Sequence, residues 1–543
     1  MNDVAHTSDV HTGGDAVCAA LEALGVRTIF GIPSQQNLAL YDALRRSGRI
    51  RMIGARHEAG AVHAADGYAR ATGELGVAIV STGPGTANAV NGLYEAGFAS
   101  SPVLLITTQV DRVHLGRGRS FIHDADGQSQ MLRSVTRRTE CVMHGHRIAD
   151  TIMSVAADIL SGRPQPGAVE IPTDLLSAPT TSGLLRMGEQ VRIAPDEALI
   201  ERAAALLDGA KRPLLWLGGG SVSAEAAEAV RSLVERLGIP VVSSLNGRGC
   251  VPTDHPLFIG SQTHYPAFRP LLEQADAVLA IGTRFQAVAT WFWSLPMPAK
   301  LIQVDVDPTA IGRNFPVEIG IVGDARLAVE SLSRKIRGGV IDSDFLRLAG
   351  SVRAELAADT GQRIGPDHTG LCDAIARHAP KERVVVCDAT MTGTTWGSQR
   401  LPADRPRQFM YSTSLAIGPA LPLGVGAAVG SGKRTIVMHG DGGIMLSLGE
   451  LATAVEAAAP VTVLVFNNQG YGGLKYLQTA YGIPHVGVDL HTPDFVGFGT
   501  AMGLPSWRVD NVADFEAVFA SAMAGDGPNL IEVDITTMVP LEL

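Results

Sequence analysis

The sequence predicts an α/β protein made of three doubly wound parallel-sheet domains. The chain has 543 residues, too many for one hydrophobic core and suited to about three domains of ordinary size. Short runs rich in Val, Ile and Leu alternate with segments whose apolar residues recur every three or four positions. Such near-continuous apolar strands are typical of parallel sheets that helices cover on both faces.

The first domain is expected within residues 1–180. It opens with a predicted helix over 13–26, whose apolar residues have helical spacing. The predicted strands follow in the segments RTIFGIP, GVAIVSTGPG, SPVLLITTQ and GAVEIPTDLL. The polar, proline-punctuated stretch 177–195 is predicted to be a linker.

Two more domains are expected at 196–340 and 365–543. The second begins with a strand, a Gly-Gly-Gly turn, an amphipathic helix and a strand over 212–244, and ADAVLAIGTRF and AKLIQVDVDP extend its sheet. The charged segment 336–365 is predicted to cross to the third domain. That domain has predicted strands in ERVVVCDAT, RTIVMHGDGG, VTVLVFNN and NLIEVDITTMV.

Charge and composition argue against several classes of protein. The net charge of −10 disfavours nucleic acid and anionic membrane as partners, because both need a basic face. The five cysteines are scattered and form no CxxC pair, which favours a reducing compartment over a disulfide or zinc site. The N-terminus does not look like a signal peptide, and no apolar stretch approaches the roughly 18 residues of a membrane span. We therefore expect a cytoplasmic protein.

The segment GDGGIMLSLGELATAVEAAAPVTVLVFNNQGYGG, 440–473, carries the strongest chemical pattern. A buried strand delivers Asp441, and the next strand ends in Asn467 and Asn468. Both loops should meet at the carboxyl edge of a parallel sheet, where ligands bind. Asp441, Asn468 and the carbonyl of Gly470 offer three oxygens, which suits Mg²⁺ shared with phosphate oxygens and water. Small residues let backbone N–H groups approach a diphosphate closely, at Gly442 and Gly443 among others.

This pattern resembles the diphosphate and magnesium motif of thiamine diphosphate (ThDP) enzymes of the acetolactate synthase and pyruvate decarboxylase superfamily. The resemblance implies that Asp441 and Asn468 are side-chain ligands of Mg²⁺ and that Gly470 is the carbonyl ligand. It covers nearly the whole chain. RHEAGAVHAADGYARATG, 56–73, and STGPGTANAVNG, 81–92, look like the pyrimidine-binding half, and LAIGPALPLGVGAA, 415–428, looks like the segment that bends the cofactor.

Glu58 matches the family's catalytic glutamate, which hydrogen bonds to the aminopyrimidine ring so that the cofactor can lose its C2 proton. We expect this side chain to be poorly solvated, as suits a group that moves protons at neutral pH. A carboxylate stabilised by a helix N-terminus is the plainer alternative for the same position. In the family the cofactor touches the first domain of one subunit and the third of another, so a homodimer or homotetramer with active sites at the subunit interface is implied.

Further cofactor contacts follow from the same resemblance. Ile417 matches the bulky apolar residue that forces the two cofactor rings into a V, and the carbonyl of Leu415 would accept from the 4′-amino group. Thr390 and Met391 follow a strand at the place where relatives contact the diphosphate. Gly83 and Tyr471 lie in the matching glycine-rich segments.

The middle domain is expected to be mainly structural. Its Gly218–Gly220 turn and its Asp305-Val306-Asp307 segment are weak signs of a nucleotide site. The flavin-containing acetolactate synthases carry Asp-Asp-Arg after the motif that reads GTRFQAVATW here. FAD is therefore not expected.

The most favoured reaction is non-oxidative decarboxylation of a 2-oxo acid. The G-R-G-R…H-x-x-x-x-Q pattern of 115–128 resembles the guanidino-oxopentanoate decarboxylases, which makes His123 and Gln128 candidate proton donors or substrate anchors. Leu477 stands where synthases that select a bulkier acceptor carry tryptophan, and the paired histidines of pyruvate decarboxylase do not appear.

Other functions stay open. Carboligation of a 2-oxo acid with an aldehyde or a second oxo acid is the main alternative, and C–C hydrolysis of a diketone is a further one. A ThDP-fold protein that only binds cofactor is disfavoured by Glu58, which a binder does not need. A nicotinamide dehydrogenase is weaker still, because no G-x-G-x-x-G opens a helix in the first or middle domain.

Overall fold

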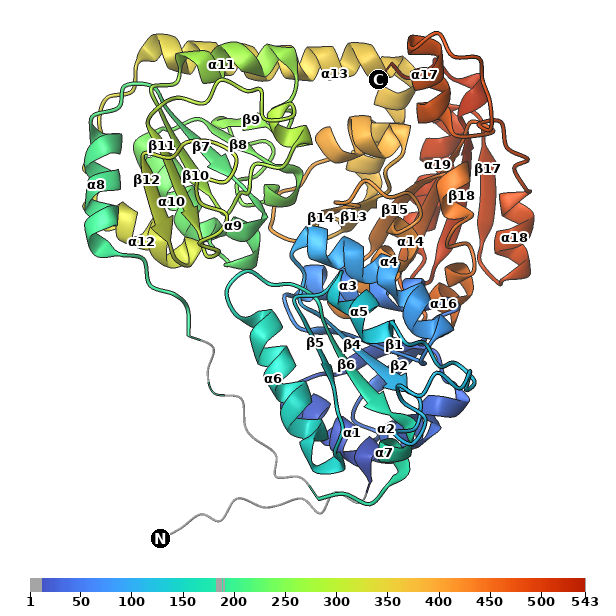
Figure 1. Cartoon of the computed structure of the whole chain (residues 1–543). Helices are drawn as coiled ribbons and strands as arrows, with labels where there is room; N and C mark the ends of the chain where they lie inside the picture. The colour runs from blue at the N-terminus through green and yellow to red at the C-terminus, as the bar shows by residue number, and fades with distance from the viewer. Residues whose placement is uncertain (1–11, 182–187, 189–190, 543) are drawn as a thin grey trace.

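The chain folds into three domains, each built on a six-stranded parallel sheet (Figure 1). The computed structural model describes residues 12–181, 188 and 191–542. The three sheets confirm the predicted α/β class with three domains. The limits 1–180, 196–340 and 365–543 themselves stay a prediction.

The N-terminal sheet has the strand order β2-β1-β3-β4-β6-β5. Apolar residues of helical spacing pack its helices on the sheet. Its strands are β1 (Thr28–Gly31), β2 (Arg51–Gly54), β3 (Gly76–Val80), β4 (Val103–Gln109), β5 (Arg138–Cys141) and β6 (Gly167–Pro172). Its helices are α1 (Gly13–Ala23), α2 (Leu38–Ser47), α3 (Glu58–Thr72), α4 (Pro84–Ala99), α5 (Gln128–Arg133), α6 (Ile148–Leu160) and α7 (Thr173–Ser177).

The middle sheet has the order β12-β11-β10-β7-β8-β9 and its own apolar clusters. Its strands are β7 (Pro213–Leu217), β8 (Val241–Ser243), β9 (Phe258–Gly260), β10 (Ala277–Ile281), β11 (Leu301–Asp305) and β12 (Ile319–Val322). Its helices are α8 (Glu197–Asp208), α9 (Gly219–Ser223), α10 (Ala227–Leu237), α11 (Arg269–Gln274) and α12 (Ala325–Lys335).

A long helical connection, α13 (Ser343–His378), leads to the C-terminal domain along the top of Figure 1. It is kinked at Gly365, where φ is 70° and Pro366 follows. The predicted crossing segment, 336–365, is thus helical from Ser343 onward. The C-terminal strand order, β14-β13-β15-β16-β18-β17, repeats that of the N-terminal sheet strand for strand.

Strands and helices alternate along the C-terminal domain. The strands are β13 (Val384–Cys387), β14 (Phe409–Tyr411), β15 (Thr435–Gly440), β16 (Val461–Asn467), β17 (Ser506–Val509) and β18 (Asn529–Asp534). The helices are α14 (Ala420–Ser431), α15 (Asp441–Ile444), α16 (Glu450–Glu456), α17 (Gly472–Ala480), α18 (Phe495–Ala501) and α19 (Val512–Ala524).

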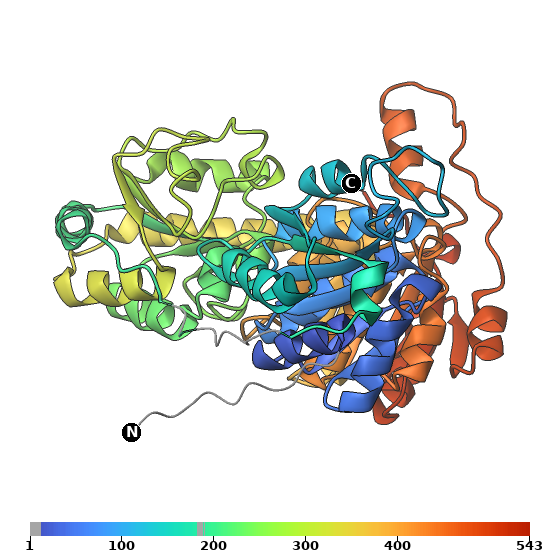
Figure 2. The ribbon, with the colours of Figure 1, turned by 60° about the horizontal axis from the view of Figure 1, so that its bottom comes forward.

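The N- and C-terminal domains pack directly on each other, while the middle domain stands to one side (Figures 1 and 2). The helices α3 and α14 meet at backbone distance. A Cβ atom on Gly67 would lie 2.0 Å from the carbonyl oxygen of Leu423, and one on Gly426 would lie 1.8 Å from that of Ala64. These two glycines therefore permit the contact. Side chains of both domains form one apolar cluster around it.

Part of the predicted linker, residues 182–187 and 189–190, lies outside the described residues, as do 1–11 and 543. The described residues between α7 and α8 form neither helix nor strand. Among the helices of the described ranges, none has the length and apolar character needed to cross a membrane.

Candidate active site

Three neighbouring strands of the C-terminal sheet end in polar residues. Asp388 directly follows β13, Asp441 follows β15 and Asn468 follows β16. The parallel register, with Cys387 opposite Met438 and Gly440 opposite Phe466, brings these strand ends to one edge. The chain order of the strands reverses between β13 and β15, which is where ligands bind in open α/β sheets.

The Asp441 carboxylate, the Asn468 side-chain amide and the Gly470 carbonyl converge at this edge. The side-chain oxygen of Asn468 lies 2.9 Å from the carbonyl oxygen of Gly470 and 3.2 Å from Oδ1 of Asp441. Oxygens this close repel one another unless a cation lies among them, or unless the amide turns and donates its NH₂ instead. One carboxylate, one amide and one carbonyl are the hard oxygen ligands that Mg²⁺ prefers. The predicted metal ligands thus lie together and fit a divalent cation.

Asp441 is held rigidly in this place. Its side chain is buried, and Oδ2 accepts a hydrogen bond of 2.7 Å from the N–H of Gly470. Burial raises the pKa of the Asp441 carboxyl, while backbone N–H groups, first that of Gly470, oppose the rise. Gly470 has φ of +154°, and a Cβ there would lie 2.2 Å from the carbonyl oxygen of Val488. The ligand loop therefore requires glycine at this position.

The remaining residues predicted for the diphosphate side surround the same edge. The ring of Tyr471 lies against Gly442, where an added Cβ would be 2.6 Å from it. Met391 approaches the Asn468 amide, with its sulfur 3.9 Å from Nδ2. Thr390 lies between Asp388 and the end of β15. The structure therefore brings these sequence-predicted residues together.

The loop before α14 lies beside α15. Leu415 is 49% exposed and has φ of 64°, an uncommon conformation for a residue other than glycine. Ile417 is partly buried. A Cβ on Gly418, at φ of +103°, would lie 2.9 Å from Cβ of Leu446 and 3.5 Å from the carbonyl oxygen of Gly443. The loop that carries Leu415, the predicted carbonyl acceptor, and Ile417, the predicted cofactor-bending residue, therefore lies next to the Asp441 helix.

Asp388 and His439 form a buried pair that sequence reasoning missed. Both oxygens of Asp388 accept from the N–H of Gly418, at 3.0 and 2.8 Å, and Oδ2 lies 3.2 Å from Nδ1 of His439. Nε2 of His439 accepts from the N–H of Leu421 at 2.8 Å, which assigns the ring hydrogen to Nδ1. Nδ1 lies beside Asp388 but forms no hydrogen bond with the described residues. The pair fixes the C-terminal end of the Leu415–Gly418 loop. Asp388 directly follows a buried strand, which is the signal that could have found it.

Glu58 is the first residue of α3 and lies beside α4. Its Oε2 accepts a hydrogen bond of 2.9 Å from Nδ2 of Asn88. Its Oε1 lies near Gly85, 3.3 Å from where a Cβ would be. The side chain is partly exposed in the single chain, so the expected poor solvation is not present without a further covering surface.

His123 and Gln128 occupy different environments. Gln128 is buried, and its Oε1 accepts from the N–H of Gly83 at 2.7 Å while its Nε2 donates to Glu170 at 2.8 Å. Its amide is thus engaged in holding the Gly83 turn. His123 is exposed with φ of 64°, and its backbone covers Gly83, where a Cβ would lie 2.6 Å from the His123 carbonyl oxygen. Only the His123 side chain is free to face a substrate.

The residues that gave weak signs of a nucleotide site also meet in space. The Gly219-Gly220 turn, Arg284 and Asp305 line a cavity of about 760 Å³ between the N-terminal and middle domains. Burial raises the pKa of Asp305 to about 6. This cavity is separate from the polar edge at Asp441.

Comparison with known proteins agrees with this arrangement. Residues 11–131 match the thiamine pyrophosphate enzyme N-terminal TPP binding domain, 200–332 the central domain and 391–533 the C-terminal TPP binding domain. The chain belongs to the thiamine pyrophosphate enzyme family.

Its relatives include both decarboxylases and synthases. The chain is 33% identical to the probable 2-ketoarginine decarboxylase AruI of Pseudomonas aeruginosa, over 96% of this chain and 94% of that protein. It is 32% identical to acetolactate synthase of Mycobacterium bovis, over 96% and 87%. It is 31% identical to the chloroplastic acetolactate synthase of Arabidopsis thaliana, over 96% and 81%.

Proposed function

We propose that this protein is a ThDP- and Mg²⁺-dependent enzyme that decarboxylates a 2-oxo acid without oxidation. The observation that carries the proposal is the convergence of the Asp441 carboxylate, the Asn468 side-chain amide and the Gly470 carbonyl at the carboxyl edge of a ThDP-family sheet. When bound, ThDP supplies a nucleophilic carbon that adds to the substrate carbonyl and accepts the electrons of the broken C–C bond.

The C-terminal domain would hold the cofactor. Asp441, Asn468 and the Gly470 carbonyl bind Mg²⁺, while a diphosphate lies against the backbone of Gly442 and Gly443 and the residues Thr390, Met391 and Tyr471. The Leu415 carbonyl would accept a hydrogen bond from the amino group of the cofactor, and the Ile417 side chain would pack against its rings and support their bent conformation. The support is that these residues surround one strand edge.

Glu58 would act as the catalytic acid and base. Its carboxylate would hydrogen bond to a ring nitrogen of the bound cofactor and would hold or release a proton there. Asn88 donates to one carboxylate oxygen and orients the other. Gly83 and its anchor Gln128 shape the wall of the site, and His123 stands at its exposed side to protonate the product or anchor the substrate.

A second copy of the chain would complete the site, as a homodimer or homotetramer. Glu58 is only partly covered, and exposed apolar side chains lie on the elements around both halves of the site. Surfaces of this kind mark interaction sites. They are contributed by Tyr94, Phe98, Leu415, Met445, Leu446 and Leu474.

Carboligation is the second candidate, because the chain is 32% identical to an acetolactate synthase over 96% of its length. Leu477 is exposed on α17, in the element that follows the Gly470 loop. Synthases that select a bulkier acceptor carry tryptophan at this position, so the leucine counts against acetolactate synthesis and leaves carboligation in second place. Hydrolysis of a diketone ranks third.

The proposal is tested by incubating the purified chain with ThDP, Mg²⁺ and a panel of 2-oxo acids. 2-Ketoarginine and pyruvate belong in the panel, because the names of the relatives point to both chemistries. We expect CO₂ and aldehyde in equal amounts from at least one acid, and neither without ThDP. A 2-hydroxyketone as the main product would support the carboligase instead, and no CO₂ from any acid would contradict both.

A further inference from the structure

Two buried carboxylates reach across the boundary between the N- and C-terminal domains. Glu95 lies on α4 of the first domain, and Glu450 begins α16 of the third. Their side chains are almost fully buried. Each accepts hydrogen bonds from two consecutive backbone N–H groups of the opposite domain. Neither residue carries a role in the mechanism proposed above.

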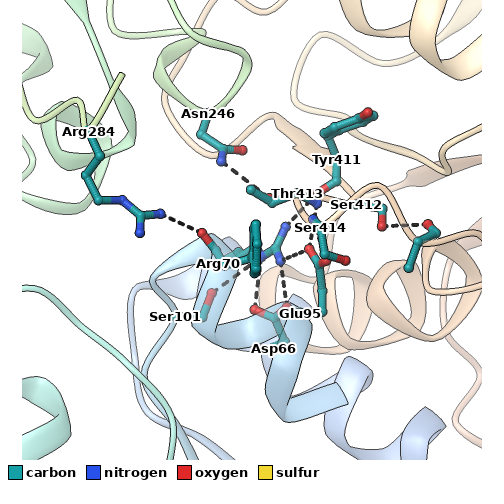
Figure 3. Close-up of polar contacts among 12 residues, drawn as sticks. Asp66, Arg70, Glu95, Ser101, Asn246, Arg284, Tyr411, Ser412, Thr413 and Ser414 are labelled. Atoms are coloured by element: carbon teal, nitrogen blue, oxygen red, sulfur yellow. Dashed lines mark hydrogen bonds and ion pairs between the residues drawn. The ribbon is translucent and has the colours of Figure 1, made fainter. Parts of the chain in front are cut away.

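Glu95 holds the backbone just before Leu415 (Figure 3). Its Oε1 accepts from the N–H of Thr413 at 2.7 Å, and its Oε2 accepts from that of Ser414 at 2.9 Å. Arg70 lies 2.7 Å from the same carboxylate and donates to the Tyr411 carbonyl at 2.8 Å. Two N–H groups bound by one rigid carboxylate fix the orientation of both peptide planes.

The charge on Glu95 is consistent with the hydrogen bonds that it accepts. Asp66 also pairs with Arg70, at 2.7 Å, so the guanidinium lies between two carboxylates (Figure 3). Burial by itself would raise the pKa of Glu95, but the charge of Arg70 and the N–H of Ser414 outweigh it and hold that pKa below its ordinary value. Glu95 is therefore an ionised acceptor at neutral pH.

The loop that Glu95 grips needs such support. Leu415 has φ of 64°, a conformation that costs free energy unless the surroundings fix it. The Ser412 hydroxyl donates to the Ala416 carbonyl at 2.7 Å, and Asp388 binds the N–H of Gly418. Glu95 thus fixes one end of the loop and Asp388 the other.

Glu450 makes the reverse contact just before Glu58. Its Oε1 accepts from the N–H of Arg56 at 3.1 Å and from that of His57 at 3.0 Å. A Cβ on Gly60 would lie 2.2 Å from this oxygen, so only glycine leaves room for the carboxylate. The start of α3, and with it the origin of the Glu58 side chain, is fixed by the C-terminal domain.

We propose that Glu95 and Glu450 are reciprocal positioning residues, each fixing the backbone that precedes a cofactor-contacting residue of the other domain. Glu95 sets the Leu415 carbonyl and the Ile417 side chain, and Glu450 sets Glu58. The inference rests on the proposed function of those residues. It assigns the contact between the two domains of one chain a role in aligning the residues that this chain contributes to the sites at the subunit interface.

The first test uses the cofactor-free protein and the variants Glu95→Gln and Glu450→Ala. Glu95 uses both of its oxygens, so glutamine, which has one, deprives one of the two N–H groups of its acceptor. Glu450 binds both N–H groups through Oε1, so alanine is needed to remove that acceptor. We expect backbone hydrogen exchange, followed by mass spectrometry, to become at least about tenfold faster in 411–418 for Glu95→Gln and in 55–60 for Glu450→Ala, since a tenfold rate corresponds to about 1.4 kcal/mol. Unchanged protection in both segments would overturn the inference.

The matched control is Asp276→Asn. Asp276 binds the consecutive N–H groups of Lys211 and Arg212, at 2.8 and 2.9 Å, but in the middle domain. This variant should leave protection of 411–418 and 55–60 unchanged. Should Glu95→Gln fail to fold, Glu95→Asp keeps the charge beside Arg70 and shortens the reach by one methylene, and the same loss of protection in 411–418 is expected.

The second test separates positioning from stability in the loaded enzyme. We expect C2 proton exchange of bound ThDP to slow at least about tenfold in both Glu95→Gln and Glu450→Ala, because a displacement of about 1 Å can cost up to roughly 100-fold. ThDP affinity should stay within about threefold, since the Mg²⁺ ligands are untouched. Exchange at the parental rate per bound cofactor would overturn the inference. A parent that binds no ThDP would instead refute the proposed function.

Discussion

The carboxylate of Glu58 accepts a hydrogen bond of 2.9 Å from the side-chain amide of Asn88, one helix further along the N-terminal domain. The contact occupies Oε2 and leaves Oε1 beside Gly85, which has no side chain of its own to cover that oxygen. One oxygen is thus anchored and the other is available. This arrangement suits a carboxylate that must present one oxygen in a fixed direction.

Glu58→Gln is expected to retain ThDP and to slow C2 proton exchange by about 100- to 10,000-fold, because general acid–base groups typically contribute this much. Asn88→Ala should slow it by only roughly tenfold, as expected for one hydrogen bond to a charged group. NMR of acid-quenched samples in D₂O measures both rates. A Glu58→Gln rate within about threefold of the parent would remove Glu58 from the mechanism.

Asp441→Ala is expected to lower ThDP affinity in Mg²⁺ by more than about 100-fold, since loss of outer-shell partners alone already costs 10- to 100-fold. The fold should survive, because the residue lies at a strand end. Calorimetric titration with ThDP measures the affinity, and circular dichroism checks the fold. Asp526→Ala, at an exposed aspartate of the same domain, is the control and should bind as the parent does. Equal affinity in the two variants would refute the metal site.

His123→Ala should slow aldehyde release more than CO₂ release, because the exposed imidazole is the group that would protonate the product. An added aldehyde should then capture more of the donor fragment as 2-hydroxyketone. His114→Ala is the control, since His114 belongs to the same loop and stacks on Phe121 with ring centroids 4.0 Å apart. A parent that forms chiefly 2-hydroxyketone, in a ratio that His123→Ala leaves unchanged, would refute both the decarboxylase and this role.

The purified protein is expected to carry no flavin, because the Asp-Asp-Arg of the flavin-containing synthases is missing after Arg284. The cavity of about 760 Å³ between the N-terminal and middle domains makes the measurement informative. An absorption spectrum of the protein, before and after incubation with FAD and gel filtration, decides it. A retained band near the flavin absorption maximum would show the prediction to be wrong.

The sequence predicted the interior of every sheet but none of its edges. The strands found from apolar runs include β1, β3, β10 and β15, and each has neighbours on both sides. The strands that were missed are the two outermost of each sheet, β2, β5, β9, β12, β14 and β17. An edge strand pairs on one side only and is short, so its residues lack the continuous apolar run that marks a buried strand. β2 and β5, for example, read RMIG and RTEC.

In the candidate site, the residues that lie close together in the sequence were predictable, and the contacts between distant segments were not. Asp441, Asn468 and Gly470 belong to one short segment, and local pattern was enough to group them. Glu95 and Thr413 are 318 positions apart, and Glu450 and Arg56 are 394 apart. Nothing in either local sequence marks such a pairing, because it depends on how α3 packs on α14. His439 and Asp388 were missed for a different reason: they lie at neighbouring strands of one sheet, and although Asp388 directly follows a buried strand, its own segment does not show that His439 lies beside it.

The apolar cluster shared by the N- and C-terminal domains has a consequence for how the molecule denatures. Side chains from both domains fill it, so neither domain can lose its structure without exposing part of the other, whereas the middle domain has clusters of its own. Calorimetric melting should therefore show two transitions rather than three. ThDP and Mg²⁺ should raise the melting temperature of the joined pair only. At a ligand concentration of 100 times the dissociation constant, the free energy of unfolding of that pair should increase by about 2.7 kcal/mol. Separate melting of the first and third domains would contradict this coupling. A single transition for both domains, shifted by the ligands, would mean that the pair of domains unfolds as one cooperative unit.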